Sequence, residues 1–170
     1  YPFPEDVLHW HQTAAAACAP FGDTLYDRLK AWCDEYFYLP HRKEPRGVGG
    51  IFFDDWTGEI FSDVFAFVQS VGNHILPGYL PILSRRKDLK FGEKEESFML
   101  YRRGRYAEFN LAIDRGTKYG MQSGRRIESV LASMPPRATW KYDWSPEPNS
   151  AESRLYEDYL RPRDWIRELT

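Results

Sequence analysis

With 170 residues, 42% of them hydrophobic and 16% aromatic, the chain can bury a core and is not an intrinsically disordered segment. A formal net charge of −2 and an isoelectric point near 6.1 argue against a general binder of nucleic acid. No apolar run reaches the roughly 18 residues that a membrane-spanning helix needs.

The first third of the chain predicts two helices. Pro4, followed by two acidic residues, favours a helix start, and apolar residues at helical spacing continue that helix to about Ala19. After a Phe-Gly break, Asp23 can cap the next helix, whose buried stripe is Leu25, Leu29, Trp32 and Tyr36. Residues 41–50 then form a loop before an apolar strand over Ile51–Phe53.

The middle of the chain predicts a third helix over about Ile60–Ile75. Its apolar stripe consists of Phe61, Val64, Phe65, Val68 and Ile75. Pro77 is expected to end this helix and Pro81 to interrupt the segment after it, because proline has no N–H for a helical hydrogen bond. A polar helix over residues 92–100 comes next.

Polar and apolar side chains alternate along Tyr106–Asp114, within a segment, Leu100–Thr117, that also contains Arg102, Arg103, Arg105 and Arg115. A period of two residues predicts a half-buried strand. We therefore expect a strand in this segment, a hairpin turn at Asp114–Gly116 and a return strand near Lys118–Gln122.

The last part predicts a short helix over Arg126–Met134 and a final helix that Ser150 caps and that ends at Leu160. Between them it predicts an alternating strand whose inward residues are Ala138, Trp140, Tyr142 and Trp144. Helices and strands do not alternate in a βαβ rhythm. The prediction is therefore an α+β fold, with an antiparallel β-sheet flanked by helices, in a single domain over residues 1–170.

The glycine-rich loop at 45–50, PRGVGG, admits three interpretations. Glycines let backbone N–H groups approach phosphate, but here they precede a strand and no Lys-Ser/Thr pair comes after them, unlike nucleotide-binding loops. They also suit a bend where two backbones pass closely. Thirdly, a stiff loop can hold Arg46 as a clamp for a carboxylate, which a guanidinium binds through two parallel hydrogen bonds.

Two further arginine clusters lie later in the chain. Arg102-Arg103-Gly-Arg105 lies beside aromatic residues, as in RNA-binding segments. The slightly acidic chain instead favours solvated or ion-paired arginines, with nearby partners at Glu93, Glu95 and Glu96. The segment Gln122–Arg126 precedes a predicted helix, so it forms either an anion site or an ordinary loop.

Histidines and cysteines offer weaker signals. His11 lies on the apolar side of the first helix, where a hydrogen-bonded core histidine is the usual explanation. His9 and His11 cannot chelate from one helix face, and His11 would share a divalent cation with His41 only if the fold brings them together. Cys18 and Cys33 form no C-x-x-C pair and favour packing in a reducing compartment. We therefore expect a cytoplasmic protein, with mitochondrial association as the alternative if the source is a eukaryote.

A series of blocks resembles one enzyme family, in order and over almost the whole chain. They are HWH at 9–11, CAPFGD at 18–23, KAWCDEYFYLPHR at 30–42, RGVGGIFFDD at 46–55, YLPILSRRKD at 79–88, LYRRGRYAEFN at 100–110, DRGT at 114–117, SGRRIES at 123–129, SMPP at 133–136, WKYDW at 140–144 and PRDW at 162–165. The chain resembles the oxygen-dependent coproporphyrinogen III oxidases, especially the bacterial members.

The resemblance implies that two propionates of coproporphyrinogen III become vinyl groups, giving protoporphyrinogen IX in haem biosynthesis. Molecular oxygen is the implied oxidant, without flavin or haem, and bacterial members suggest a divalent cation, manganese. A homodimer is implied, with neither nucleic acid nor a membrane span. Separate guanidiniums among aromatic residues would suit this apolar macrocycle with four carboxylates.

The resemblance also carries residue roles. Arg46 matches an active-site arginine, and Gly124, Arg125 and Arg126 match a substrate-contacting loop, although bacterial relatives usually have glycine at the place of Arg125. His11 and His41 match suggested metal ligands. The segment Tyr106–Lys141 overlaps the family's dimerisation region, and an exposed strand edge in it is expected to form the two-fold contact. The residues expected at the dimer contact are His41, Tyr106, Glu108 and Asn110.

The family's catalytic aspartate, in a Gly-Gly-x-Asp-Leu-Thr-Pro stretch, and its proton-donor histidine are expected to precede Tyr1. We therefore expect a C-terminal part of the enzyme domain, without turnover by itself. The alternative is an incomplete chain or pseudo-enzyme that dimerises or binds porphyrins without turnover. An RNA-binding module is a more distant alternative.

Overall fold

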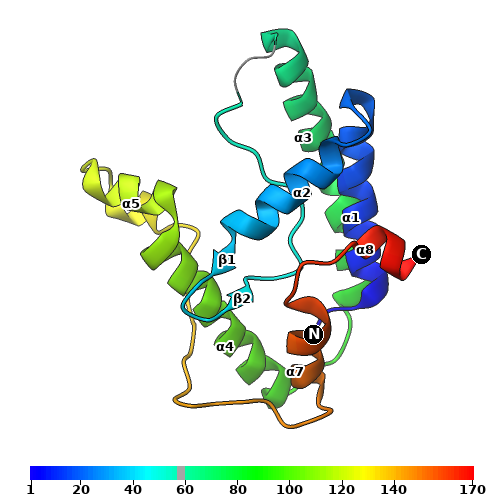
Figure 1. The fold of residues 1–170 in the computed structure, drawn as a ribbon. Helices are drawn as coiled ribbons and strands as arrows, with labels where there is room; N and C mark the ends of the chain where they lie inside the picture. Colours follow the sequence, from blue (N-terminus) through cyan, green and yellow to red (C-terminus); the bar gives the residue numbers. More distant parts are fainter. Residues whose placement is uncertain (57–59) are drawn as a thin grey trace. The chain divides into compact units, whose positions relative to one another are not determined.

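The computed structural model describes residues 1–56 and 60–170 and is mostly helical (Figure 1). The chain divides into two compact units. The first unit comprises Tyr1–Leu89 and Leu155–Thr170, and the second comprises Lys90–Arg154. None of the described helices is both long and apolar enough to cross a membrane.

The first unit is built on α1 (Pro4–Cys18), α2 (Leu25–Tyr36) and α3 (Phe61–Arg86). The predicted helix start at Pro4 and the second helix are confirmed. α1 lies along α3 and also packs against the short α8 (Trp165–Leu169), which the sequence did not predict (Figure 1). A 3-10 turn, η1 (Ala19–Phe21), leads towards α2, and the buried core includes Cys18, Leu25, Leu29 and Phe67.

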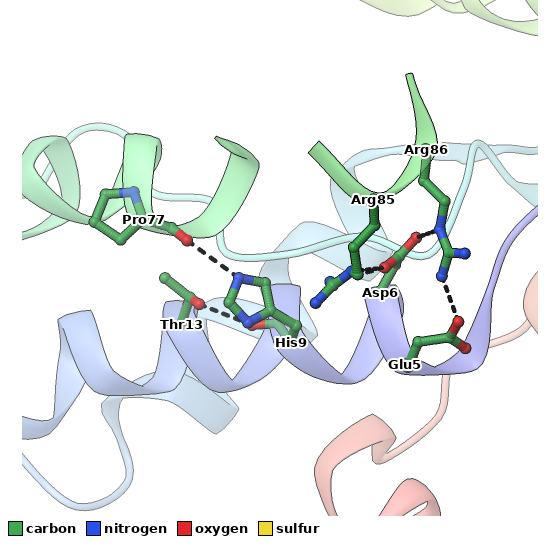
Figure 2. Close-up of polar contacts among 7 residues, drawn as sticks. All are labelled: Glu5, Asp6, His9, Thr13, Pro77, Arg85 and Arg86. Atoms are coloured by element: carbon green, nitrogen blue, oxygen red, sulfur yellow. Dashed lines mark hydrogen bonds and ion pairs between the residues drawn. The ribbon is translucent and has the colours of Figure 1, made fainter. Parts of the chain in front are cut away.

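α3 does not end at Pro77, so the predicted helix end is wrong. The helix continues through Pro77 and Pro81 to Arg86. Pro81 has no N–H to offer the carbonyl of Pro77 one turn earlier, but His9 Nε2–H of α1 donates to that carbonyl at 3.1 Å (Figure 2). The neighbouring helix thus supplies a donor that the proline removed.

Ion pairs also join the start of α1 to the end of α3, as Figure 2 shows. Arg85 Nε donates to one carboxylate oxygen of Asp6 (3.1 Å) and Arg86 Nε donates to the other (2.6 Å). Arg86 also pairs with Glu5. Burial opposes ionisation of Asp6, but the hydrogen bonds from the two arginines outweigh it and lower the pKa of this carboxyl.

The β-structure among the described residues is one ladder of two short antiparallel strands. β1 (Tyr38–Leu39) pairs with β2 (Glu44–Pro45), with Tyr38 opposite Pro45. The predicted strand Ile51–Phe53 is irregular backbone instead, with the Phe53 ring 5.0 Å from that of Phe67 in the core. The predicted antiparallel sheet is therefore confirmed only in this small form, and the fold is mostly helical.

The second unit contains α4 (Glu93–Glu108), a π-helical turn η2 (Phe109–Ile113), α5 (Arg115–Gln122), α6 (Ile127–Val130) and α7 (Ala151–Arg154). The strand predicted within Leu100–Thr117, the hairpin turn and the return strand are all wrong. The buried side chains of this segment recur every three or four residues, at Phe98, Tyr101, Arg105 and Phe109. This spacing is that of a helix, and it decides the structure against the alternation of polar and apolar residues. Asp114 caps α5, accepting from Thr117 N–H at 2.6 Å.

The predicted strand Ala138–Trp144 is also wrong. This segment is irregular and lies against α4, where Thr139 N–H donates to the Leu100 carbonyl at 3.1 Å. Tyr142, expected to face inward, is 100% exposed. The helix predicted over Arg126–Met134 shrinks to the single turn of α6.

The predicted cap at Ser150 is confirmed, because its hydroxyl accepts from Ser153 N–H at 3.0 Å. The helix that begins there is less regular than predicted. α7 passes into a π-helical turn, η3 (Leu155–Tyr159), in the first unit, and this turn ends before Pro162.

Candidate functional site

A cavity of about 450 Å³ lies in the first unit, between α1, α2, α3 and the glycine-rich loop. Its polar side chains include Asp34, Arg46 and His74. Apolar and small residues form most of the remaining wall, among them Trp10, Ala14, Ala17, Phe37, Val71 and Ile75. Such a lining suits a ligand with an apolar body and an anionic group.

Arg46 is held at the edge of this cavity by its backbone and by an aromatic ring. It comes directly after β2, and its N–H donates to the Phe37 carbonyl at 3.2 Å. The guanidinium carbon lies 4.2 Å from the centre of the Phe37 ring, a cation–π contact. The half-buried Arg46 side chain is therefore orientated before any ligand arrives.

Gly49 and Gly50 allow the loop to pass close to α1 and α2. Gly49 has a φ of +76°, and a Cβ there would lie 3.1 Å from Asp34 Oδ1. A Cβ on Gly50 would lie 3.1 Å from Trp10 Nε1. These contacts support the close-approach interpretation of PRGVGG, although the loop approaches side chains of two helices rather than a second backbone.

Asp34 and Cys33 also line the cavity wall. Lys30 donates to the Asp34 carboxylate at 2.5 Å, so this acid already has a cationic partner. Burial raises the pKa of the Cys33 thiol to about 11, and Asp34 adds to that rise. Burial likewise raises the pKa of Cys18 to about 11. Both cysteines are free and buried, as their predicted packing role requires.

His11 is fully buried beneath the same loop. A carbonyl only accepts, so His11 Nε2–H donates to the Val48 carbonyl (3.0 Å), and Nδ1 accepts from the Tyr26 hydroxyl (2.8 Å). Burial lowers the pKa of His11 to about 4, against the opposing effect of the bond to Val48. The predicted hydrogen-bonded core histidine is confirmed.

The expected metal ligands do not fit a metal centre at His11. The lone pair that a metal would need is on Nδ1, which accepts from Tyr26, and Nε2 carries the proton given to Val48. His41 is exposed on the turn between β1 and β2. Residues 1–56 and 60–170 contain no group of three His, Cys, Asp or Glu side chains arranged for a metal ion.

The expected substrate-contacting loop lies in the second unit. Gly124, with a φ of +68°, Arg125 and Arg126 are all exposed. The Arg125 guanidinium lies 5.3 Å from the Tyr119 ring centre, and Arg126 precedes the single turn of α6. The loop thus presents two guanidiniums to solvent within its own unit.

Arg105, from the other arginine cluster, has a structural role. It is 3% exposed, lies over the Tyr101 ring at 4.4 Å, donates to the Tyr101 hydroxyl and pairs with Glu108 at 3.5 Å. Two of the three glutamates expected to pair with this cluster have other partners. Glu95 accepts from Gly92 N–H (2.8 Å), and Glu96 pairs with Arg137 (2.5 Å).

The expected dimer residues do not lie on a strand edge. Tyr106 and Glu108 are on α4, and the Glu108 carboxylate accepts from Trp140 Nε1–H at 2.9 Å. Asn110 is buried in η2 and donates to the Tyr106 carbonyl at 2.8 Å. The strand-edge argument for the two-fold contact is therefore wrong.

Sequence reasoning missed three donors around the loop. Trp10 Nε1–H donates to the Gly49 carbonyl (3.2 Å), Trp165 Nε1–H donates to the Val48 carbonyl (3.1 Å), and the Tyr26 hydroxyl orientates His11. The HWH run at 9–11 was a usable signal, since each of its three rings donates to a backbone carbonyl.

Comparison with known proteins identifies the family. Residues 1–165 match the family described as coproporphyrinogen III oxidase. The chain belongs to this family. It is therefore related to oxidoreductases of haem and porphyrin biosynthesis whose substrate is coproporphyrinogen III. The match spans both units and includes both the cavity with Arg46 and the loop with Arg126.

Proposed function

We propose that this chain contributes a substrate-binding part of an oxygen-dependent coproporphyrinogen III oxidase. Arg46 binds a propionate carboxylate of the tetrapyrrole, and the apolar wall of the cavity contacts the macrocycle. The observation that carries this proposal is an arginine held by Phe37 at the edge of a largely apolar cavity of about 450 Å³.

In this proposal the cavity takes one propionate and the pyrrole edge that carries it, because Arg46 pairs best with a single carboxylate. Within the second unit, the loop of Gly124, Arg125 and Arg126 is a separate candidate for binding a carboxylate. Four separate acid groups call for several guanidiniums, since each arginine pairs best with one carboxylate.

The proposed reaction balances for each propionate. The chain –CH2–CH2–COO⁻ with O2 and one proton gives –CH=CH2, CO2 and H2O2. The C–C bond to the carboxylate breaks, the propionate loses one proton and two electrons, and O2 takes up the two electrons and two protons to form H2O2. An arginine that binds the other, non-reacting carboxylates would orientate the reacting one without taking part in the electron transfer.

A second candidate function is porphyrin binding without turnover. It shares the binding residues and differs only in the chemistry. With the protein in air, coproporphyrinogen should yield one CO2 for each O2 consumed, and turnover should stop under argon. Equal turnover under argon would contradict the oxygen-dependent reaction, and ligand binding with no turnover in air would favour the second candidate.

The binding step is tested by titrating coproporphyrin III with the 170-residue chain and following the porphyrin absorbance. Arg46→Gln should weaken binding about tenfold or more, as expected for loss of a charge-assisted hydrogen bond. Arg28→Gln is the matched control, because Arg28 is an exposed arginine near the Trp56 ring (5.3 Å) and does not line this cavity. Equal affinities of the two variants would overturn the proposal.

A further inference from the structure

We propose that His11 is a positioning residue that holds the Val48 carbonyl and thereby fixes the loop carrying Arg46, rather than a metal ligand. The part of this inference that concerns ligand affinity rests on the proposed function. The part that concerns the hydrogen bonds does not.

Two consecutive carbonyls of the loop are held by three ring N–H donors. Trp10 donates to Gly49 (3.2 Å), and His11 (3.0 Å) and Trp165 (3.1 Å) both donate to Val48. A carbonyl oxygen has two lone pairs, so Val48 is fully satisfied by its two donors. The donors come from α1 and α8, which pack against each other.

These bonds restrain a backbone that its composition would leave mobile. The loop has glycines at positions 47, 49 and 50, and glycine loses the most conformational freedom on ordering. On the other side of Arg46, the β1–β2 ladder and the Phe37 carbonyl hold the chain. Arg46 therefore lies between two fixed points, which lowers the cost of ordering it when a carboxylate binds.

The direction of the bond also requires one tautomer of His11. Tyr26 donates to Nδ1 (2.8 Å), so the ring keeps its proton on Nε2, where Val48 accepts it. Aromatic contacts hold the ring plane, since Trp165 lies 6.0 Å from the His11 ring centre and Tyr26 lies 6.3 Å from it. A metal at either nitrogen would have to displace one of these partners.

NMR of the wild-type chain tests both the tautomer of His11 and the prediction that His11 binds no metal. A long-range proton–nitrogen spectrum should show His11 protonated at Nε2 and bare at Nδ1. Addition of one equivalent of MnCl2 should leave the His11 ring signals sharp. The Nδ1–H tautomer, or selective broadening of the His11 signals by stoichiometric manganese, would overturn the proposal.

The positioning role is tested with His11→Leu and Trp165→Phe, each of which removes one donor to Val48. Amide exchange at Gly47–Gly50 should speed up, and the Kd for coproporphyrin III should rise about three- to tenfold. Trp165→Phe keeps an aromatic ring in the core, so it provides the same test if the His11→Leu variant does not fold. The matched control is His9→Leu on the same helix, which loses a bond to Pro77 and should change neither readout.

The two proposals fail in different ways. If Arg46→Gln binds as the wild type does, the proposed function is wrong, while loop exchange still decides whether His11 fixes the loop. If Arg46→Gln weakens binding but His11→Leu and Trp165→Phe change neither affinity nor loop exchange, the positioning role is wrong and the proposed function stands.

Discussion

The imidazole of His9 donates to the carbonyl of Pro77 at 3.1 Å, at the point in α3 where Pro81 leaves that carbonyl without its helical donor. A ring on α1 therefore replaces the missing backbone N–H. This replacement helps explain how one helix of 26 residues can contain two interior prolines.

The replacement predicts coupling between His9 and Pro81. His9→Leu should lower the free energy of unfolding by about 1 kcal/mol, the usual net value of such a hydrogen bond. In a Pro81→Ala background, the new Ala N–H can donate to Pro77, so the same substitution should cost clearly less. Urea denaturation of the four proteins measures this coupling, and additive effects would show that His9 does not compensate for Pro81.

Gly104 is where α4 meets the irregular segment that precedes Trp140. A Cβ at this position would lie 2.7 Å from the Thr139 carbonyl oxygen, which is backbone and cannot rotate away. Gly104→Ala should therefore lower stability by about 1–3 kcal/mol through overpacking. The control is Gly72→Ala in α3, where nothing lies within 4 Å and the better helix former should raise stability by about 0.5–1 kcal/mol. Thermal unfolding of both variants compares them, and equal shifts would contradict the close contact.

Low pH should weaken the ion pairs between α1 and α3, because it protonates the Asp6 carboxylate. The pKa of Asp6 is lowered in the folded chain, so the unfolded chain, with an Asp pKa of about 3.9, takes up the proton first. This stabilisation is complete above about pH 4 and is lost as the pH falls through the folded-state pKa. The stability difference between the wild type and Asp6→Asn should therefore shrink from pH 6 to pH 2. A difference independent of pH would contradict the ionised pairing with Arg85 and Arg86.

How much of the fold the sequence predicted depends on whether local signals agreed with packing. The start at Pro4, the burial of Leu25 and Leu29 and the Ser150 cap were predicted from local chemistry and are confirmed. Trp32, predicted to be buried in the same stripe, is exposed. The prediction of a strand within Leu100–Thr117 is wrong because apolar residues there fit both the two-residue period of a strand and the 3.6-residue period of a helix. Helical packing of Phe98, Tyr101 and Arg105 decides between them, and single-sequence alternation does not show that packing.

The candidate site was predicted in part. The loop around Arg46 was identified from its glycines and its arginine, which are local features. Its support was not, because Trp165 lies 117 residues from Val48 along the chain and its indole contact depends on the tertiary fold. The same limit applies to Pro77 and Pro81, whose effect on α3 depends on a histidine 68 residues away from Pro77.

The central claim is that Arg46 recognises a carboxylate, and a ligand lacking that charge tests it most directly. Coproporphyrin III and its tetramethyl ester are titrated against the wild type and Arg46→Gln in the same detergent buffer. We expect the substitution to weaken binding of the free acid about tenfold or more and to leave binding of the ester nearly unchanged. An equal loss for both ligands would contradict the account, because Arg46 would then act on the shape of the cavity and not on the charge of the substrate.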